Sequence, residues 1–453
     1  MIGLEYLKDF YNSGATLSLS FRRKQLENLK KSITNYEEEI NASLFIDLKK
    51  SKEEIWASET GLLVKEINFA IKHLSKWMKP KKVSTGIATF PSTAKIYQDP
   101  LGIVLIISPW NYPLQLLLVP LVGAIAAGNC VVLKPSEMAP ATEKIIIKLI
   151  AETFDNNYIK VVAGNGAIVI PDMMNNFHFD HIFYTGSTHI GKEVYKLAAK
   201  DLIPVTLELG GKSPCIIDAD ADITVAAKRI VVGKFLNAGQ TCIAPDYILV
   251  HETVKDKLLN SLVENIKKFY TSDPSSSYDY GKIINENNFE RLTNFLSNGE
   301  VFYGGKFNKS ILYIEPTILI DISLEDEIMK EEIFGPLLPV LSFSTLEEAI
   351  EIVQQNKNPL SFYLFTKNKK TEEKMMQRIA FGGGCVNNTM WHFSNMNMPF
   401  GGIGNSGIGS YHGKKTFEIF SHAKPVLKTA TWFDPRIKYP SFKGKLKFLK
   451  KML

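Results

Sequence analysis

The sequence predicts an α/β protein whose main sheet is doubly wound and Rossmann-like, and three observations support this fold class. Short apolar runs rich in β-branched residues alternate with helical patterns between residues 102 and 209, which is typical of a parallel sheet covered by helices. A second alternating set follows, so we expect a second α/β domain. The chain has 453 residues, of which 45% are hydrophobic and 22% charged, and it can therefore bury a sizeable core.

Residues 18–78 carry the spacing of amphipathic helices, with apolar residues at helical intervals. We interpret this region as helices that pack on the face of a domain. Residues 80–100 contain β-prone residues interrupted by a proline, which suits a protruding edge strand or hairpin. The apolar residues of the helical stripes are Leu19, Leu26, Leu29 and Ile33, and then Leu62, Ile67, Ile71 and Leu74.

Strand, loop and helix units then follow each other along the chain. The run 102–108 has the length and β-branching of a fully buried parallel strand. The apolar stretch after it, 114–127, is too short and too interrupted to cross a bilayer. No period of about 20 to 50 residues recurs, which excludes a solenoid. The further expected elements are strands at 130–135, 181–185 and 248–250 and helices at 141–150 and 189–199.

Cysteine usage and charge exclude several classes of protein. The four cysteines are Cys130, Cys215, Cys242 and Cys385. They form no CxxC pair, which argues against a metal site and a disulfide framework. No N-terminal stretch has the pattern of a secretory signal, so we expect a cytoplasmic protein. The net charge of +6 comes from the residues after 423, which carry nine Lys or Arg and one acid, and this argues against a nucleic-acid-binding face.

The segment 207–244 holds a carboxylate, Glu208, just before a Gly-Gly turn, and a thiol, Cys242, in the motif GQTC. The residues between them suffice for a strand and a helix that fold back and bring both side chains to one cleft. A thiolate is a strong nucleophile, and a nearby carboxylate can take its proton or activate a water molecule. A single cysteine is more often a small buried hydrophobe, so the surrounding motifs decide between the two interpretations.

Seven short motifs follow one another along the chain, and any one of them alone would be a weak signal. They are PWNYP at 109–113, KPSE at 134–137, FYTGS at 183–187, ELGGK at 208–212, GQTC at 239–242, EEIFGP at 331–336 and PFGG at 399–402. Together they resemble the NAD(P)-dependent aldehyde dehydrogenase superfamily, from about Trp56 to about Pro425. The segments 239–247 and 406–413, with a short N-terminal region, are similar to the class-three branch.

The resemblance implies a dinucleotide-binding domain, an α/β catalytic domain and a small oligomerisation hairpin. A lone hairpin is marginally stable unless a partner covers its edge and face, so we expect a homodimer. The assigned residues are 1–80, 98–207 and 397–414 for the first domain, 208–396 for the catalytic domain, 81–97 and 415–430 for the oligomerisation segments, and 431–453 for a basic tail.

The nearest phosphate-binding candidate is GSTHIG at 186–191, between an expected strand and an expected helix. Free N–H groups and the positive helix end attract a pyrophosphate, whereas the bare motif would be an ordinary strand-to-helix turn. By resemblance, Glu137 and Lys134 would contact the adenosine ribose. This favours NAD as cofactor, although class-three relatives commonly use NADP as well. The cofactor-binding residues expected in this way are Trp110, Lys134, Glu137, Gly186, Ser187, Gly191, Glu332 and Phe334.

The resemblance also implies a reaction on an aldehyde. Cys242 would attack the aldehyde carbon, Asn111 and the Cys242 backbone N–H would bind the oxyanion, and hydride would pass to the nicotinamide. Glu208 would then activate the water that hydrolyses the thioester to a free acid. An Asn in such a loop is otherwise most often a turn former. Two alternatives stay open: a coenzyme-A-acylating dehydrogenase, which typically lacks the carboxylate, and a non-catalytic protein on the same fold.

The sequence indicates a class of substrate and no single molecule. The resemblance implies medium- or long-chain aliphatic or aromatic aldehydes. The apolar and aromatic residues near the expected entrance, Tyr112, Trp391 and Phe393, are compatible with such substrates.

The C-terminal tail has a pattern of its own. Phe442, Leu446, Leu449 and Leu453 recur at helical spacing among five lysines. This is typical of a basic amphipathic segment, and we expect reversible adsorption to an anionic membrane surface without crossing it. The alternative interpretation is a tail that is solvated or packed on another subunit.

Overall fold

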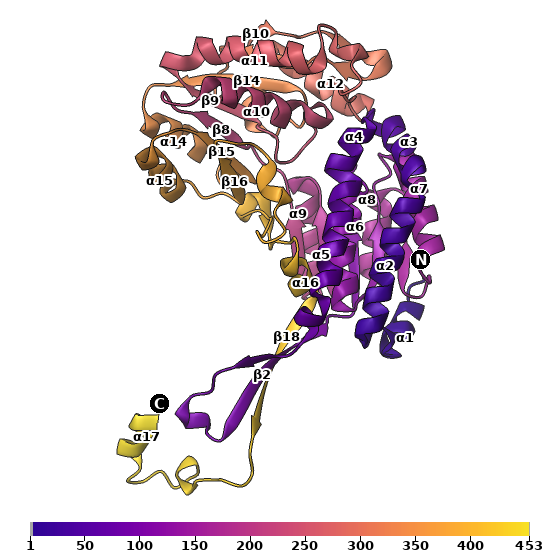
Figure 1. The fold of residues 1–453 in the computed structure, drawn as a ribbon, viewed down its shortest axis with the longest axis vertical. Coiled ribbons are helices and arrows are strands. Elements are labelled where there is room, and N and C mark those ends of the chain that lie inside the picture. Colours follow the sequence, from indigo (N-terminus) through magenta and orange to yellow (C-terminus); the bar gives the residue numbers. More distant parts are fainter. Residues whose placement is uncertain (1–2, 453) are drawn as a thin grey trace.

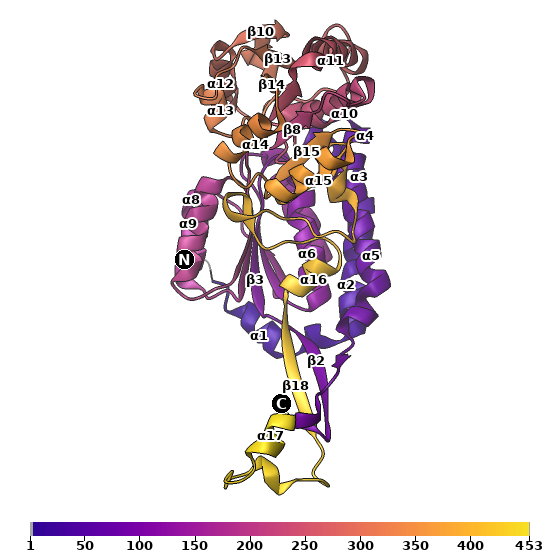
Figure 2. The same ribbon diagram turned by 90° about the vertical axis from the view of Figure 1, so that its left-hand side faces the viewer.

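The computed structural model describes residues 3–452 and shows two α/β units above a narrow arm (Figure 1). Each unit has its own large sheet, and the arm carries the C-terminal tail at its far end. Figure 2 shows the arm projecting away from both units. Among the described residues, no helix is long and apolar enough to cross a membrane.

The lower unit in Figure 1 is built on a six-stranded sheet. Its strands are β3 (Ile103–Ile107), β4 (Cys130–Lys134), β5 (Ile159–Val161), β6 (His181–Thr185), β7 (Val205–Glu208) and β17 (Gly407–Ile408). The order is β17-β7-β6-β3-β4-β5, and only β17 is antiparallel to its neighbour. The chain winds outward from β3 to β5 and then returns to β6 beside β3, which confirms the doubly wound sheet. Such sheets bind ligands where the winding direction changes, here beyond the ends of β3 and β6.

Helices cover both faces of this sheet (Figure 2). The helix after β3, α6 (Gln115–Ala127), is buried along its whole length, because the N-terminal helices cover the side that faces away from the sheet. The helices expected within residues 18–78 are confirmed. The remaining helices of this unit are α1 (Tyr6–Asn12), α2 (Leu19–Asn35), α3 (Glu37–Leu48), α4 (Lys52–Ile55), α5 (Gly61–Met78), α7 (Pro140–Thr153), α8 (Gly166–Asn176) and α9 (Thr188–Ala199), with a π-helical turn η2 (Trp56–Thr60) between α4 and α5.

The upper unit holds a seven-stranded sheet in the order β10-β13-β14-β9-β8-β15-β16. Its strands are β8 (Pro214–Ile217), β9 (Tyr247–His251), β10 (Glu300–Tyr303), β13 (Thr317–Ile320), β14 (Leu337–Phe343), β15 (Ser361–Phe365) and β16 (Gly383–Val386). Only the edge strand β10 is antiparallel to its neighbour. The helices are α10 (Ile223–Phe235), α11 (Lys255–Tyr270), α12 (Glu286–Asn294), α13 (Glu327–Lys330), α14 (Leu346–Gln355) and α15 (Lys369–Arg378), and a small ladder joins β11 (Phe307–Asn308) to β12 (Tyr313–Ile314).

The arm joins two segments that are far apart in the sequence. β2 (Ser92–Pro100) pairs with β18 (Ser421–Thr429) along its whole length, and β1 (Lys81–Val83) pairs with the other edge of β2. The sequence predicts an edge strand or a local hairpin here. In the structure β2 forms its longest pairing with β18, a strand that is distant in the sequence. The short helix α16 (Lys414–Ile419), which precedes β18, packs on α6 in the lower unit.

The tail follows the arm and remains exposed at its tip (Figure 1). Its helix, α17 (Leu446–Met452), begins after Gly444, which has a φ of +79°. The expectation of one helical stripe from Phe442 onward is therefore wrong, because Phe442 precedes this left-handed glycine and lies outside the helix. Leu453 lies outside the described residues.

Candidate active site

A cavity of about 1150 Å³ lies where loops of the two units meet. Three residues singled out from the sequence line it together: Glu208, Asn111 and Cys242. Glu208 is the last residue of β7, and Asn111 lies in the loop that follows β3. Cys242 lies in the other unit, in the loop before β9. The cavity therefore combines a thiol from one unit with a carboxyl and an amide from the other.

The Cys242 thiol is half-buried at the cavity wall. Burial, and then the negative charges of Glu332 and Glu208, raise the pKa of this thiol. At neutral pH the sulfur is therefore protonated, and a nucleophilic role requires a group that takes its proton. None of the other three cysteines lines the cavity, so Cys242 is the thiol that can meet a ligand there.

The Glu208 carboxyl group is only 3% exposed, and neither of its oxygens has a hydrogen-bond partner within residues 3–452. Burial raises the pKa of Glu208 well above its ordinary value. Buried polar atoms are nearly always paired, so an unpaired carboxyl at a cavity wall indicates a functional group. A carboxylate with a raised pKa is a stronger base, which suits it to accept a proton from water or from a thiol.

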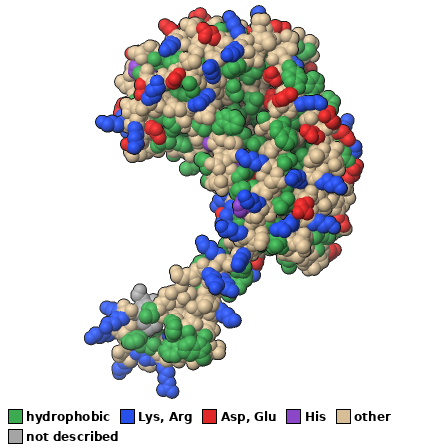
Figure 3. All heavy atoms as spheres, in the orientation of Figure 1, with side chains coloured by type: hydrophobic (Ala, Val, Ile, Leu, Met, Phe, Trp, Pro, Cys, Tyr) green, Lys and Arg blue, Asp and Glu red, His purple; other side chains and the backbone are tan. Residues whose placement is uncertain are grey.

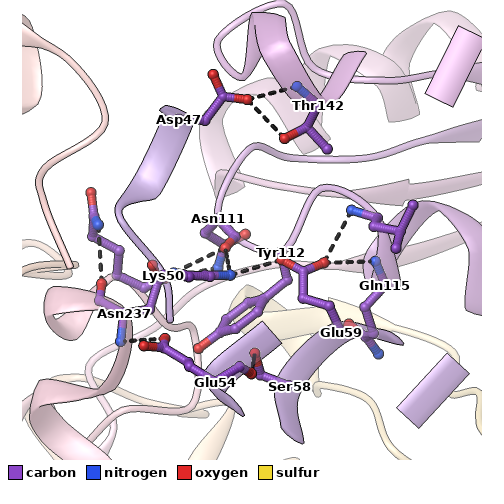
Figure 4. A network of polar contacts seen from close by, with 12 residues as sticks. Asp47, Lys50, Glu54, Ser58, Glu59, Asn111, Tyr112, Gln115, Thr142 and Asn237 are labelled. Atoms are coloured by element: carbon purple, nitrogen blue, oxygen red, sulfur yellow. Dashed lines mark hydrogen bonds and ion pairs between the residues drawn. The ribbon is translucent and has the colours of Figure 1, made fainter. Parts of the chain in front are cut away.

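The Asn111 side chain lies between the two units (Figure 4). Its Nδ2 donates to the Gln240 carbonyl oxygen at 3.0 Å, two residues before Cys242, and its Oδ1 is buried without a partner among the described residues. The amide carries two N–H bonds, so one remains for an oxygen in the cavity. The Asn111 carbonyl oxygen accepts hydrogen bonds from Lys50 Nζ at 2.8 Å and Asn237 Nδ2 at 2.9 Å, and these bonds fix the loop.

The loop before Cys242 has an unusual backbone. Asn237, Ala238 and Gly239 all have positive φ values, of 51°, 51° and 76°. A Cβ atom on Gly239 would lie 2.2 Å from the Gly335 carbonyl oxygen, so only glycine fits. Gln240 holds the loop in place, because its Nε2 donates to the carbonyl oxygens of Asn237 and Lys282. The glycine and glutamine of the GQTC motif therefore have structural roles.

Glu332 lies directly against the Gly-Gly turn after Glu208. A Cβ atom on Gly210 would lie 1.9 Å from Glu332 Oε2. Burial, and then the charge of Asp246, raise the pKa of Glu332 to about 8. The carboxyl groups of Glu208, which is buried, and Glu332, which is half-buried, thus lie close enough to the Cys242 thiol to raise its pKa.

The segment that carries Glu332 and Phe334 is held by residues that the sequence analysis did not single out. Lys212 forms a buried ion pair with Asp246 and donates to the Glu331 carbonyl oxygen at 2.9 Å. Asp246 accepts from the Ile333 N–H at 2.9 Å, and Arg291 donates to the Ile333 carbonyl oxygen at 2.7 Å. Lys212 lies inside the motif at 208–212 and Asp246 inside the segment 239–247, whereas no sequence signal marks Arg291.

Comparisons with known proteins identify the family of this chain. The model of the aldehyde dehydrogenase family matches residues 8–426. The chain belongs to the aldehyde dehydrogenase family. The 4,4'-diaponeurosporen-aldehyde dehydrogenase of Staphylococcus aureus is 45% identical, over 98% of this chain and 96% of that protein. A solved structure described as the substrate-bound state of Staphylococcus aureus AldH has a TM-score of 0.98 and 44% identity, and the match covers 100% of this chain and 99% of that one.

Relatives also place the chain near the class-three branch. Family 3 member H1 of Arabidopsis thaliana is 43% identical, over 99% of this chain and 93% of that protein. The dimeric NADP-preferring aldehyde dehydrogenase of Rattus norvegicus is 43% identical, over 93% of this chain and 92% of that protein. The enzyme thus oxidises aldehydes to acids with NAD(P) as cofactor.

The turn from β6 to α9 fits the pyrophosphate of such a cofactor. Gly186 and Ser187 line the cavity, and the Ser187 side chain caps α9 by accepting from the Ile190 N–H at 3.4 Å. The hydroxyl of Thr185, the last residue of β6, is buried at the cavity wall without a partner among the described residues. Free N–H groups at a helix start together with an unpaired hydroxyl suit an anion. Gly191 lies inside α9, where a Cβ atom would meet Leu209 Cδ2 at 2.5 Å, so it permits close packing of helix and strand.

The other expected cofactor residues fall into two groups. Trp110 and Phe334 line the cavity and pack edge to face, with ring centroids 5.3 Å apart. Lys134 and Glu137 are not among the described residues that line it. Lys134 Nζ donates to Glu137 Oε2 at 2.9 Å, and Glu137 Oε1 accepts from the Gly166 N–H at 2.7 Å. Partial burial raises the pKa of Glu137, but these donors lower it more, so that the carboxyl is ionised.

Replacing Glu332 by Gln should speed the alkylation of Cys242 by iodoacetamide, because one negative charge near the sulfur is removed and the pKa of the thiol falls. We expect a several-fold larger rate constant near pH 8.5, where native Glu332 is mostly ionised, since one pKa unit corresponds to about tenfold. Mass spectrometry locates the adduct. Glu331→Gln, which removes the exposed neighbouring carboxylate, should leave the rate unchanged. A slower reaction in Glu332→Gln would instead identify Glu332 as the base for the thiol.

Proposed function

We propose that the enzyme converts apolar aldehydes to free carboxylic acids through a covalent intermediate on Cys242, with Glu208 as general base and Asn111 as oxyanion donor. The observation that carries this proposal is the meeting of these three groups at one cavity, with the Glu208 carboxyl group unpaired. Trp110, Gly186, Ser187, Glu332 and Phe334 would hold the cofactor at the same cavity, while Lys134 and Glu137 would reach only its adenosine end.

The reaction begins when the Cys242 sulfur gives its proton to the ionised Glu208 carboxylate and bonds to the aldehyde carbon. The free Asn111 N–H and the Cys242 backbone N–H donate to the oxygen that becomes negative, and one such donor contributes about 3 kcal/mol of barrier lowering. Bound NAD(P) supplies the acceptor for the hydride that leaves this carbon.

The second half of the reaction releases the acid. Loss of the hydride leaves a thioester on Cys242, and Glu208 passes the first proton to solvent. Glu208 then takes a proton from water, and the water oxygen bonds to the thioester carbon. The carbon–sulfur bond then breaks, the sulfur leaves as thiolate, and the carboxylic acid departs. The carboxylate of Glu208 argues for this hydrolysis and against transfer of the acyl group to coenzyme A.

Replacing Cys242 by Ala should abolish NADH formation from aldehyde, while cofactor binding stays within about twofold, because the thiol is needed only for the covalent step. Glu208→Gln should slow thioester hydrolysis most strongly. Intact-protein mass spectrometry after mixing with aldehyde and NAD should then detect an acyl adduct on Cys242. Cys385→Ser, a matched control at a cysteine outside the cavity, should keep native turnover. Unimpaired turnover by Glu208→Gln, or turnover that requires coenzyme A, would contradict the proposal.

The substrate class rests on the cavity lining. Leu116, Val232, Trp391 and Phe393 provide apolar surface in the same cavity as Cys242. A relative of 45% identity is named a 4,4'-diaponeurosporen-aldehyde dehydrogenase. We expect kcat/KM to rise along a series of straight-chain aldehydes from two to ten carbons, because each buried CH₂ adds about 0.8 kcal/mol. A preference for short or charged aldehydes would contradict this substrate class.

We further propose a homodimer formed through the arm, and a cytoplasmic location at the inner membrane surface through the tail. Relatives named as dimeric and the exposed face of β18 support the first proposal. For the second, Figure 3 shows apolar side chains at the arm tip beside Lys and Arg, and Trp432 is 75% exposed. Basic tails with apolar side chains adsorb to anionic lipids.

Removing residues 430–453 should separate these two proposals. Sedimentation at micromolar concentration should give a dimer for both the full and the shortened protein, because the arm strands remain. Only the full protein should pellet with phosphatidylserine-containing vesicles, and salt should release it. A stable full-length monomer would contradict the dimer. Equal pelleting of the two proteins, or pelleting of neither, would contradict the membrane proposal.

A further inference from the structure

A buried ion pair lies behind the Asn111 loop (Figure 4). Lys50 Nζ and Glu59 Oε1 are 2.8 Å apart, and both side chains are 0% exposed. Lys50 follows α3, and Glu59 belongs to η2, so both come from the N-terminal helical region. Neither residue lines the active-site cavity. The pair therefore does not touch a ligand there, and its contacts must explain its presence.

The Lys50 ammonium makes its other contacts with the loop after β3. Nζ donates to the Asn111 carbonyl oxygen at 2.8 Å and lies 3.9 Å from the centre of the Tyr112 ring. A cation over an aromatic ring is attracted by the ring electrons, more strongly when the site is dry. Lys50 thus holds two successive residues of this loop, one of which carries the proposed oxyanion donor.

The Glu59 carboxylate holds the other end of the same loop. Its Oε2 accepts from the Leu114 N–H at 3.1 Å and from the Gln115 N–H at 3.0 Å. These N–H groups lie at the start of α6, where backbone donors have no partner within the helix. A negative charge is favourable at this helix end. Lys50 and Glu59 therefore hold the loop between them from residue 111 to residue 115.

The loop is in turn bonded to the segment that carries the nucleophile. The Tyr112 hydroxyl is 2.6 Å from the Thr241 hydroxyl oxygen, next to Cys242 in the chain. Asn111 Nδ2 donates to the Gln240 carbonyl oxygen, as described above. A displacement of the loop would therefore change the position of Asn111 relative to the Cys242 sulfur.

A fully buried ion pair is an expensive way to stabilise a fold, because desolvation offsets much of the attraction. The N-terminal helices already pack through a large apolar core. Within residues 3–452, the other side-chain hydrogen bonds and the ring contact of this pair go to residues 111–115. Preorganised donors are effective because they need not reorient during the reaction. The contacts of Lys50 and Glu59 with residues 111–115 hold the loop rigid enough for such a donor.

We propose that Lys50 and Glu59 are positioning residues, which hold the Asn111 amide in place for the oxyanion by clamping the loop 111–115 at both ends. This inference rests on the role proposed above for Asn111. It assigns a part in turnover to the N-terminal helical region, which supplies no residue that reacts.

A double-mutant cycle with Asn111→Ala tests this inference. Asn111→Ala should lower kcat by about 100-fold or more, and Lys50→Met in the native background should lower kcat by about tenfold or more, with the KM for NAD nearly unchanged. In the Asn111→Ala background, Lys50→Met should cost less than about twofold, because the donor that it positions is already absent. A role in stability alone would give the same factor in both backgrounds.

Two further variants distinguish a positioning role from a loss of stability. Lys50→Met/Glu59→Gln removes both charges without leaving an unpaired buried charge, and it should reproduce the loss of kcat if the single variant folds poorly. Arg22→Met removes another buried cation, which donates to the Ala126 carbonyl oxygen at the opposite end of α6. It should lower the melting temperature while keeping native kcat.

The outcomes separate this inference from the proposed reaction. Native kcat in Lys50→Met, or equal losses in both backgrounds, would overturn the positioning role alone. Native kcat in Asn111→Ala would overturn the oxyanion role of Asn111 and the positioning inference with it. Loss of turnover in Cys242→Ala would in that case still support the covalent mechanism.

Discussion

The hydrogen bond from Asn111 Nδ2 to the Gln240 carbonyl oxygen joins the two halves of the active site, and the rest of the site depends on it. Asn111 lies in the loop after β3, a strand of the six-stranded sheet. Gln240 lies in the loop before β9, a strand of the seven-stranded sheet, and this loop also carries the Cys242 thiol. Gly239 can approach Gly335 only because it has no side chain. The ion pair at Lys50 fixes one partner of the bond, and the hydrogen bonds of Gln240 fix the other.

Electrostatics in the cavity follow from the same close packing. The carboxyl groups of Glu208 and Glu332 are withdrawn from water, and each has a raised pKa. Burial raises the pKa of the neighbouring Cys242 thiol, and the two carboxyl groups raise it further once they ionise, so the sulfur stays protonated at neutral pH. A protonated thiol is a poor target for oxidants and stray electrophiles. The site therefore keeps its nucleophile unreactive until a proton acceptor and a carbonyl group are both in position.

Local sequence patterns predicted the elements whose side chains are buried in a regular way. β3, β4 and β6 are buried along their whole length, so their apolar runs were sufficient to predict them as strands of a parallel sheet. The meeting of Glu208 with Cys242 was expected because the residues between them suffice for a strand and a helix that fold back, and because the surrounding motifs resemble those of a known family. Lys50 and Glu59 could not be found in this way, because charged residues in a helical region normally face water, and only the folded chain shows that both are enclosed.

Local patterns do not predict long-range pairing. The resemblance grouped residues 81–97 with 415–430, but nothing local to residues 92–100 identifies 421–429 as the strand that pairs with them, since the pairing spans most of the chain. The position of Lys134 and Glu137 relative to the cavity could not be predicted from the sequence either. The motif placed them correctly at the end of a strand, but whether they line the cavity depends on which strands flank β4.

The order of the strands has a consequence for how the chain is made. β7 ends at Glu208, and the next strand of the same sheet, β17, begins only at Gly407, directly opposite in register. The whole upper unit is thus an insertion between two adjacent strands. During synthesis from the N-terminus, the lower sheet lacks its last strand, and β2 lacks its main partner, β18, until the inserted unit has been translated. The chain must therefore complete its first domain last, which makes the final folding step of one unit depend on the other.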